Sequence, residues 1–483
     1  MIASRRLAAV AGLALLTGCR LGPDYRPPAT PATAAGAFVS ASPTTASADA
    51  PPPQWWRLYD DPVLDDLIAQ AFAANTDLRV ATANLRRARA VLTEARAANL
   101  PATTTTASFA EARQTIGTVT GPRPFSSELY RLGFDMSYEL DLYGRVRRSI
   151  EAARADAAAE AAARDTVAIG VAAETARAYA DACSGAAQLA VAERSLKIQS
   201  DSFAITERRV AVGRDSPLDV ARARAQVEAT RATIPDFTAA RQSALFRLAV
   251  LTGKPPAEID PRAAACAVPP RLLRPLPVGD GTALLARRPD VRQADRRFAA
   301  AGARIGVAKA DYFPRITLGA AVTGTGITPE ATVSSNGFGY SFGPQISWTF
   351  PNFAAVRARV RQNRANAEAA IATFDGTVLT ALRETETALS DYANGLDRNA
   401  ALRSARDQSA EAARIVRLRY GAGSAGFLDV LDAERTLATA DAQLAASDAA
   451  LTTLQVAVFR ALGGGWETLP PVARVAPVTR LTP

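Results

Sequence analysis

The chain has 483 residues, of which 48% are hydrophobic and 21% charged, which is typical of a folded protein. It contains no histidine, and its cysteines are Cys19, Cys183 and Cys266. Because histidine is the commonest general base and metal ligand, its absence argues against an enzyme and against a metal site. The net charge of +9 suggests nucleic acid as a partner to consider. The arginines, however, alternate with Asp, Glu and Ala, as in residues 86–96, so a solvated helix surface and no nucleic-acid partner is expected.

The first 19 residues have the parts of a bacterial export signal. Arg5 and Arg6 are basic, residues 7–16 are apolar, and Leu-Thr-Gly-Cys follows at 16–19. The apolar run is shorter than the roughly 20 residues of a membrane-spanning helix, so a cleaved signal peptide is predicted over 1–18. Residues 16–19 resemble a lipobox, which implies a covalent lipid on Cys19. A plain signal peptide with an incidental cysteine is the alternative. By the same resemblance, Arg rather than Asp at position 20 favours sorting to the outer membrane.

Residues 19–53 are rich in Pro, Ala, Ser and Thr, including prolines at 27–28 and 51–53. Such a composition predicts an extended, lipid-anchored tether that cannot bury a core. Beyond it, no segment reaches the roughly 18 consecutive apolar residues of a transmembrane helix, so none is expected in the mature chain.

The remainder of the chain is a tandem duplication. Residues 77–79 (Asp-Leu-Arg) recur as 290–292 (Asp-Val-Arg), an offset of 213, and residues 218–220 (Leu-Asp-Val) recur as 428–430, an offset of 210. The near-constant offset predicts a first repeat over 54–270, a second over 271–470 and a tail over 471–483.

Each copy has the same order of elements. A helix comes first, at about 77–99 and 290–311, and is ended by Pro101 or Pro314. Two strand-like segments around a loop follow, and the one at 102–109, mostly threonine, is the weakest signal. In the second segment of each copy, apolar residues alternate with glycine or polar ones: Leu132, Phe134, Met136, Tyr138 and Leu140, and Phe338, Tyr340, Phe342, Ile346, Trp348 and Phe350. This period of two fits a strand between lipid and water, and equally a half-buried sheet in a soluble protein.

Long helices come next, because no proline occurs between Pro124 and Pro217 or between Pro351 and Pro470. A helix over about 143–212 would be about 100 Å long, which indicates a coiled coil or a tube. Apolar residues recur every seven positions in two stripes on nearly opposite faces: Leu189, Leu196, Phe203 and Val210, and Val191, Ile198, Ile205 and Val212. Two such stripes suit a helix with neighbours on both flanks, as in a closed helical barrel. Pro235 is predicted to kink or break the returning helix of the first copy.

Four strands per chain cannot close a membrane barrel, because the smallest bacterial barrels have about eight strands and an open sheet edge is not tolerated in lipid. Several copies are therefore expected to share one barrel. A barrel of about eight strands is filled by its own side chains, so a pore requires at least three copies.

Five motifs together resemble one family, the TolC-type outer-membrane efflux factors, in the lipoprotein (NodT-like) branch that serves resistance-nodulation-division pumps. They are Cys19 with Gly-Pro-Asp-Tyr at 22–25, Trp55-Trp56 before Asp61 and Leu64, Arg-Pro-Asp-Val at 288–291, Arg419-Tyr420 with Gly423, and residues 427–435. The resemblance covers essentially the whole mature chain.

That resemblance implies an α+β membrane protein: a homotrimer with a shared twelve-stranded transmembrane β-barrel and a long periplasmic α-helical barrel. It implies a non-enzymatic outer-membrane channel of a tripartite efflux pump that conducts small molecules. The implied partners are a periplasmic adaptor, an inner-membrane transporter and outer-membrane lipid, with no cofactor beyond the lipid on Cys19. The alternatives are a duct for type I protein secretion and a non-conducting, lipid-anchored coiled-coil scaffold.

The candidate site is the pair of helix-to-helix turns, near 213–220 and 423–431. Leu428, Asp432 and Arg435 are spaced to lie on one helix face. The resemblance implies that they form, respectively, a hydrophobic constriction, an acidic ring and a charged tie between neighbouring helices. The alternative is that Asp432 and Arg435 are an ordinary surface pair.

Three further groups of residues have two interpretations each. Asp219 and Asp429 are either pore acids or N-terminal charges of the returning helices. Arg209 with Gly213, and Arg419 with Gly423, resemble an adaptor-docking pattern, or the glycines are helix C-caps. Cys183 and Cys266 are either a disulfide in an oxidising periplasm or two buried thiols.

Overall fold

The computed structural model describes residues 20–118, 121–469 and 472, without the side chains of 114–125. The predicted signal peptide and Cys19 therefore lie outside the described residues, as does nearly all of the predicted tail. The chain forms two compact units. The sheet unit comprises Met1–Pro28, Leu85–Glu160 and Ala294–Phe374, and the hairpin unit comprises Ala29–Asn84, Ala161–Gln293 and Asp375–Pro483. Each unit takes segments from both copies of the repeat, so the repeats are not separate compact bodies.

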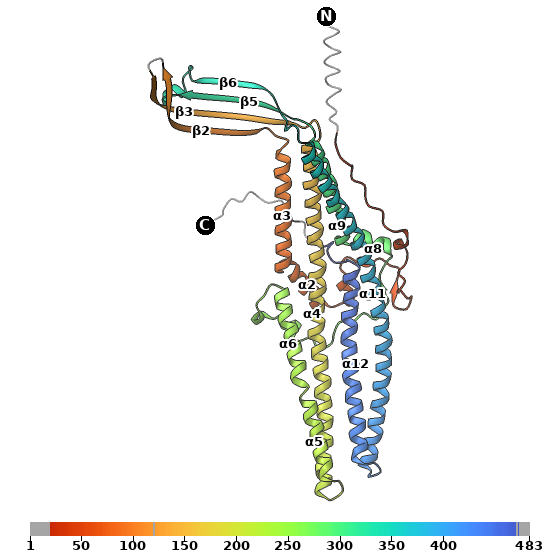
Figure 1. Cartoon of the computed structure of the whole chain (residues 1–483). Helices are drawn as coiled ribbons and strands as arrows, with labels where there is room; N and C mark the ends of the chain where they lie inside the picture. Colours follow the sequence, from red (N-terminus) through yellow and green to blue (C-terminus); the bar gives the residue numbers. More distant parts are fainter. Residues whose placement is uncertain (1–19, 119–120, 470–471, 473–483) are drawn as a thin grey trace. The chain divides into compact units, whose positions relative to one another are not determined.

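One antiparallel sheet holds the strand pairs of both copies (Figure 1). Its order is β2 (Ala102–Thr118), β3 (Gly121–Leu140), β5 (Arg315–Gly326) and β6 (Phe338–Ser347). The pairing of β3 with β5, with Met136 opposite Ala320, joins the two copies. All four predicted strands are confirmed, and β2 extends well beyond the threonine segment that indicated it. A short helix, α10 (Pro329–Thr332), lies between β5 and β6.

The alternating apolar residues of β3 and β6 remain exposed. Phe134 is 49% exposed, and Tyr340 and Phe342 are 80% and 72% exposed. Of the strand residues in this sheet whose side chains are described, only Gly133 is buried. Within the described residues of the sheet unit, these side chains are therefore left uncovered, which favours a strand between lipid and water over a half-buried sheet.

Four long helices begin or end at the positions that proline and turn residues indicate. They are α3 (Thr76–Ala97), α4 (Arg145–Ala211), α9 (Pro289–Ala310) and α11 (Phe353–Gly421). The helix α4 has 67 residues and is about 100 Å long, as predicted. Its buried Val146 and Ile150 correspond in the repeat to Val356 and Val360 of α11, which are buried too.

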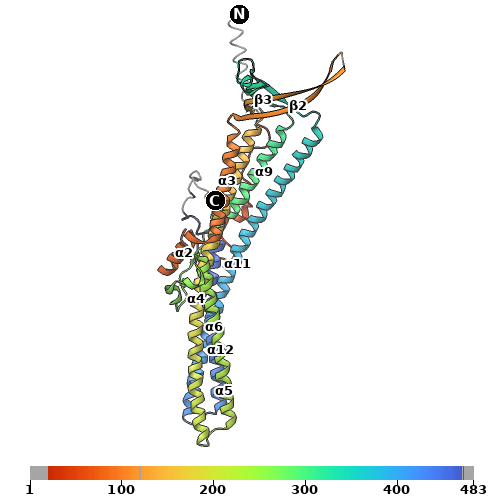
Figure 2. The same cartoon turned by 90° about the vertical axis from the view of Figure 1, so that its left-hand side faces the viewer.

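Two helical hairpins dominate the hairpin unit. The segments α5 (Pro217–Arg231) and α6 (Ile234–Leu251) run back beside α4 (Figures 1 and 2), and α12 (Phe427–Ala461) runs back beside α11. The predicted break before Pro235 is confirmed at residues 232–233, because proline lacks an N–H and its ring clashes with the preceding turn. The second hairpin has no proline here, and α12 continues unbroken.

An aromatic core holds the hairpin unit together. The 3₁₀ helix η2 (Trp55–Tyr59) and α2 (Pro62–Ala74) bury Trp55, Trp56, Leu64 and Ile68. The ring of Trp55 stacks on Phe459 of α12 with centroids 5.0 Å apart. The linker between the copies carries η3 (Pro256–Glu258), α7 (Pro261–Ala264) and β4 (Leu276–Pro277), and α8 (Gly281–Arg287) precedes α9.

The prediction of a tether without a core was wrong for residues 29–53. This segment carries η1 (Ala32–Ala35), and β1 (Ala46–Ser47) pairs in parallel with β4. Phe38 is buried, and the backbone N–H groups of Val39 and Ser40 donate to Glu386, each at 2.8 Å. Composition indicated an extended chain correctly, but it does not reveal that another segment satisfies that chain's backbone groups.

Within the described residues, no helix is both long enough and apolar enough to cross a membrane.

Candidate functional site

The two helix-to-helix turns end α4 and α11 in the same way. Gly213 and Gly423 have φ of 71° and 79°, a left-handed conformation that glycine adopts without strain. The N–H of Gly213 donates to the carbonyl of Val210 at 2.9 Å, and the N–H of Gly423 donates to Tyr420 at 3.0 Å. Residues 214 and 424 donate to the carbonyls of residues 209 and 419. The turns are thus Schellman caps, which is the C-cap interpretation of both glycines.

Replacing Gly423 with alanine is expected to destabilise the protein by roughly 1 kcal/mol, because an L side chain in the left-handed region is strained. Thermal unfolding in detergent checks this expectation. Gly376→Ala is the matched control: it lies in α11, where a Cβ would meet nothing within 4 Å, and should stabilise by about 0.5–1 kcal/mol. Equal shifts of the same sign in both variants would contradict the assignment of the cap.

Asp219 and Asp429 begin the two returning helices. The carboxylate of Asp219 accepts from the N–H of Ser216 at 3.2 Å, and that of Asp429 accepts from Gly426 at 3.0 Å. Both therefore occupy the helix N-terminus, where negative charge is favourable. Their part in a pore stays a prediction.

The predicted face of α12 is exposed. Leu428 is 55% exposed, and Asp432 and Arg435 are exposed beside it, while Phe427, Val430 and Leu431 are buried on the adjoining part of the helix surface. The guanidinium of Arg435 donates to Gln226 of α5 at 2.6 Å, not to Asp432. In the described part of the chain the Asp432 side chain makes no hydrogen bond or ion pair, so the surface pair is not observed.

Arg209, Asp215 and Tyr420 form a group that sequence reasoning missed, called here the inter-hairpin cluster. Arg209 donates to the Asp215 carboxylate at 2.9 Å and to the carbonyl of Tyr420 at 3.1 Å. Its guanidinium also lies 4.3 Å from the centre of the Tyr420 ring. The Tyr420 hydroxyl donates to Asp215. One ionised network therefore ties the end of α4 to the end of α11.

The cluster shifts the ionisation of its own members. Burial acts to raise the pKa of Asp215, but the hydrogen bonds from Arg209 and Tyr420 outweigh it and hold that pKa below its ordinary value. Burial, and then the hydrogen bond to Asp215, raise the pKa of Tyr420. At neutral pH a charged carboxylate therefore accepts from a protonated phenol, which is the stronger form of the bond.

A second cross-helix contact lies further from the turns. Glu434 of α12 is 5% exposed and accepts from Ser202 of α4 at 2.6 Å and from Arg417 of α11 at 2.9 Å. A buried carboxylate needs such partners.

The two arginines predicted as equivalent differ in the structure. Arg209 is engaged in the inter-hairpin cluster, whereas the side chain of Arg419 is exposed and makes no hydrogen bond or ion pair with the described residues. Of the two, Arg419 is the one available to a partner. Docking of an adaptor at either residue stays a prediction.

Four residues that make contacts between the helices near the turns were not identified as site residues from the sequence: Asp215, Tyr420, Gln226 and Glu434. Tyr420 and Glu434 stood inside motifs that carried the family resemblance, yet no pattern marks their partners. Asp215 and Tyr420 are 205 positions apart, so no local spacing could pair them.

Cys183 of α4 and Cys266 of the linker form a disulfide, with Cα atoms 5.0 Å apart. The bond closes a sequence separation of 83 within the hairpin unit. Across residues 20–118 and 121–469, no three His, Cys, Asp or Glu side chains are placed to hold a metal ion.

The arrangement of one strand pair and one long helical hairpin per copy can be compared with known proteins. The family described as outer membrane efflux protein matches residues 67–254 and 282–464, one match in each copy. The chain belongs to the outer membrane efflux protein family. The predicted family is therefore confirmed, and the family is one of efflux proteins rather than of enzymes.

Similar proteins match this outer membrane efflux protein along nearly its full length. The "Probable efflux pump outer membrane protein TtgC" of Pseudomonas putida is 32% identical over 94% of each chain. "Nodulation protein T" of Rhizobium leguminosarum bv. trifolii is 29% identical over 95% of this chain and 97% of that protein. The solved outer-membrane channel OprN is 37% identical, with a TM-score of 0.87 over 93% of this chain and 100% of that one. The predicted fold of the single chain and its outer-membrane location are confirmed.

Proposed function

We propose that this outer membrane efflux protein is the homotrimeric exit channel of a tripartite pump. It would passively conduct small molecules that a periplasmic adaptor and an inner-membrane resistance-nodulation-division transporter deliver. The observation that carries the proposal is the exposed aromatic face of an open four-stranded sheet, attached to helical hairpins that expose apolar stripes.

The sheet supports a shared barrel. Its edge strands, β2 and β6, have unpaired backbone groups on their outer sides, which lipid does not tolerate. Three copies paired edge to edge would close twelve strands and leave none unpaired. The exposed Tyr340 and Phe342 would then face lipid, which removes the cost of leaving them in water.

The long helix α4 supports neighbours on both flanks. A third stripe, also with a spacing of seven, is buried within the chain: Gly185, Ala192, Gln199 and Thr206. The two apolar stripes predicted from the sequence flank this buried stripe and are themselves partly buried or exposed. Ile205 is 42% exposed and Val212 is 69% exposed. A single chain thus leaves apolar surface on both sides of α4, as the wall of a helical barrel requires.

The periplasmic tip would be the gate. Leu428 would narrow the entrance, Asp432 would supply an acidic ring, and Arg435 would hold α12 against α5 through Gln226. The inter-hairpin cluster would hold the two hairpins in the closed arrangement.

The turns would also receive the adaptor. A Cβ on Gly213 or Gly423 would meet nothing within 4 Å, so the backbone is open to close approach, and Arg419 is exposed beside it. The lipid on Cys19 would be the only covalent group, and the proposal assigns neither catalysis nor a cofactor. A duct for protein secretion would share this fold, so only the identity of the exported substrate distinguishes such a duct from an efflux channel. A non-conducting scaffold does not explain why the strands expose aromatic side chains.

The double replacement Asp432→Ala with Arg435→Ala tests the channel and its gate together. It removes the acidic ring and the tie to Gln226, so single-channel conductance in a planar bilayer should rise severalfold above that of the unaltered protein. The mass of the protein in detergent, measured on the same preparation, should correspond to three chains.

Glu411→Gln is the control, because among the described residues Glu411 pairs only with Arg414 on the same helix, and the replacement should leave conductance unchanged. A monomer or dimer that conducts no ions in any variant would remove the channel. A conducting trimer insensitive to the double replacement would remove only the gate.

A further inference from the structure

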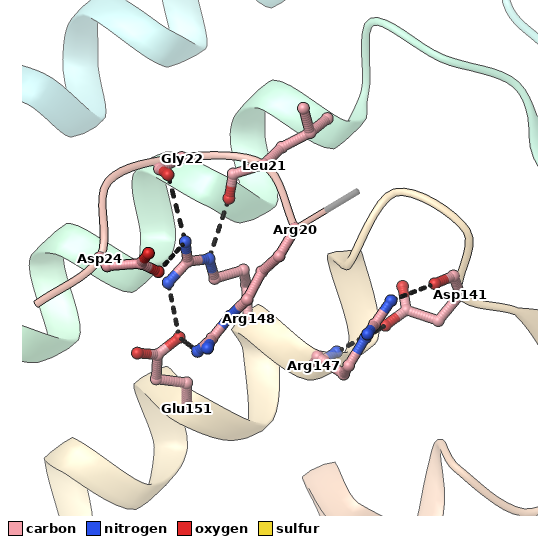
Figure 3. A network of polar contacts seen from close by, with 8 residues as sticks. All are labelled: Arg20, Leu21, Gly22, Asp24, Asp141, Arg147, Arg148 and Glu151. Atoms are coloured by element: carbon pink, nitrogen blue, oxygen red, sulfur yellow. Dashed lines mark hydrogen bonds and ion pairs between the residues drawn. The ribbon is translucent and has the colours of Figure 1, made fainter. Parts of the chain in front are cut away.

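The first described residues are held in a built site in the sheet unit. Figure 3 shows the chain from Arg20 to Asp24 passing over the first turns of α4, where Arg148 points into it. The Nε of Arg148 donates to the carbonyl of Leu21 at 2.9 Å, and its Nη2 donates to the carbonyl of Gly22 at 3.1 Å. The same Nη2 donates to the Asp24 carboxylate at 2.9 Å.

Arg148 is the buried charge of this site, with a side chain 1% exposed. Its Nη1 donates to Glu151 at 2.9 Å, and Glu151 also pairs with Arg20 (Figure 3). A buried guanidinium is costly unless its N–H groups are satisfied, and here the N-terminal segment supplies most of the acceptors. Arg148 is therefore stable in this position only with the segment docked.

The backbone contact is equally specific. A Cβ on Gly22 would lie 2.6 Å from the Cα of Gly306, and one on Gly306 would lie 2.6 Å from the carbonyl oxygen of Leu21. Gly306 is inside α9, where glycine is disfavoured by roughly 1 kcal/mol relative to alanine. The close approach of the segment accounts for it.

Tyr25 makes a second set of contacts between the N-terminal segment and α9. Its hydroxyl donates to Asp295 of α9, and its ring lies edge-on to Phe298 with centroids 6.4 Å apart. The guanidinium carbon of Arg296 lies over the Tyr25 ring, 5.3 Å from its centre.

Comparison of the two copies shows that this site is not general packing. At the repeat offset, Arg148 corresponds to Ala358 and Glu151 to Arg361, and Gly306 corresponds to Thr93. The buried apolar neighbours of Arg148, Val146 and Ile150, keep apolar counterparts in the second copy. The core is thus shared between the copies, whereas the residues that receive the N-terminal segment occur only once.

We propose that Arg148 is the positioning residue for the acylated end of the mature chain. It captures the backbone of residues 21–22, two and three positions beyond the lipid-bearing residue, and so fixes this part of the chain to the junction between β3 and α4. This inference rests on the proposed acylation of Cys19. A lipid anchored in the membrane then holds that junction at the membrane surface, which speeds entry of the strands into the bilayer. Arg148 acts on assembly and does not act on conduction.

Trypsin measures the docking directly. In the mature chain from Cys19 onward, Arg20 is the only trypsin site before Arg57, because Arg26 precedes proline, and cleavage after Arg20 creates a new N-terminus at Leu21. On the purified full-length protein, Arg148→Ala should increase the rate of this cleavage at least tenfold, as read by mass spectrometry. Arg148→Lys, which keeps the charge and one or two donors, should restore part of the protection. Arg147→Ala is the control, since Arg147 binds Asp141 and not the segment (Figure 3), and should change the rate less than twofold.

Pulse-chase labelling in cells measures the consequence. Trimers resistant to detergent should appear severalfold more slowly in Arg148→Ala than in Arg147→Ala, while channels that do form keep the unaltered conductance. Equal cleavage and equal assembly rates in the two variants would overturn the proposal. Incorporation of labelled palmitate tests the lipid separately. If the unaltered protein takes up none, the acylation fails and the positioning role falls with it, while the cleavage result still stands as a measure of docking.

Discussion

Asp215→Asn is expected to open the periplasmic end of the protein and raise its single-channel conductance severalfold. The asparagine cannot carry the charge that Arg209 and Tyr420 both contact. Loss of a hydrogen bond to a charged group costs about 1.5–3 kcal/mol. Since about 1.4 kcal/mol is tenfold in an equilibrium constant, the balance between closed and open arrangements should move at least about tenfold.

Tyr420→Phe is the graded companion to this variant. It keeps the ring beneath Arg209 and removes only the hydroxyl, so its effect should be smaller and in the same direction. Planar-bilayer recordings of both, with Glu411→Gln as the unchanged control, decide the matter. If Asp215→Asn conducts like the unaltered protein while the Asp432 and Arg435 replacement does not, the inter-hairpin cluster is structural and the gate lies on α12 alone.

The same cluster has a defined dependence on pH. Because the pKa of Asp215 is lowered in the folded protein, the cluster is fully present above the ordinary aspartate pKa of about 3.9. It is lost as the pH falls below that value and through the lower pKa of the folded state. The single-channel conductance of the unaltered protein should therefore be steady from neutral pH to about 4 and rise only at more acid pH, where Asp215 becomes protonated. This rise should be absent in Asp215→Asn.

Removal of the disulfide is expected to have the largest effect on stability. Replacing Cys183 and Cys266 with alanine removes a cross-link between residues 83 positions apart and so raises the conformational entropy of the unfolded chain. The free energy of unfolding should fall by up to about 4 kcal/mol. Each single replacement should cost nearly as much as the double one, because either breaks the bridge. Reduction of the unaltered protein should reproduce the loss in thermal unfolding, whereas the reductant should not affect the double variant. Equal stability of the double variant and the unaltered protein would show that α4 and the linker hold together without the bond.

Much of the architecture was predictable because it is set by residues close together in the chain. Prolines ended α3 and α9 and broke the helix before Pro235, and the period of two located β3 and β6. The face of α12 that exposes Leu428, Asp432 and Arg435 follows from helix geometry alone. The capping roles of Gly213 and Gly423 are equally local, since φ above zero and a helix end are properties of a few residues.

Only the tertiary structure decided which distant groups meet. Asp215 and Tyr420 belong to different hairpins, and Arg209 and Arg419, alike in sequence, separate into an engaged and an exposed side chain. The segment 29–53 was misjudged for the same reason, because its backbone partners lie hundreds of positions away. A hydrogen bond depends on the distance between two atoms, and across the hairpins that distance is set by how the helices pack rather than by spacing along the chain.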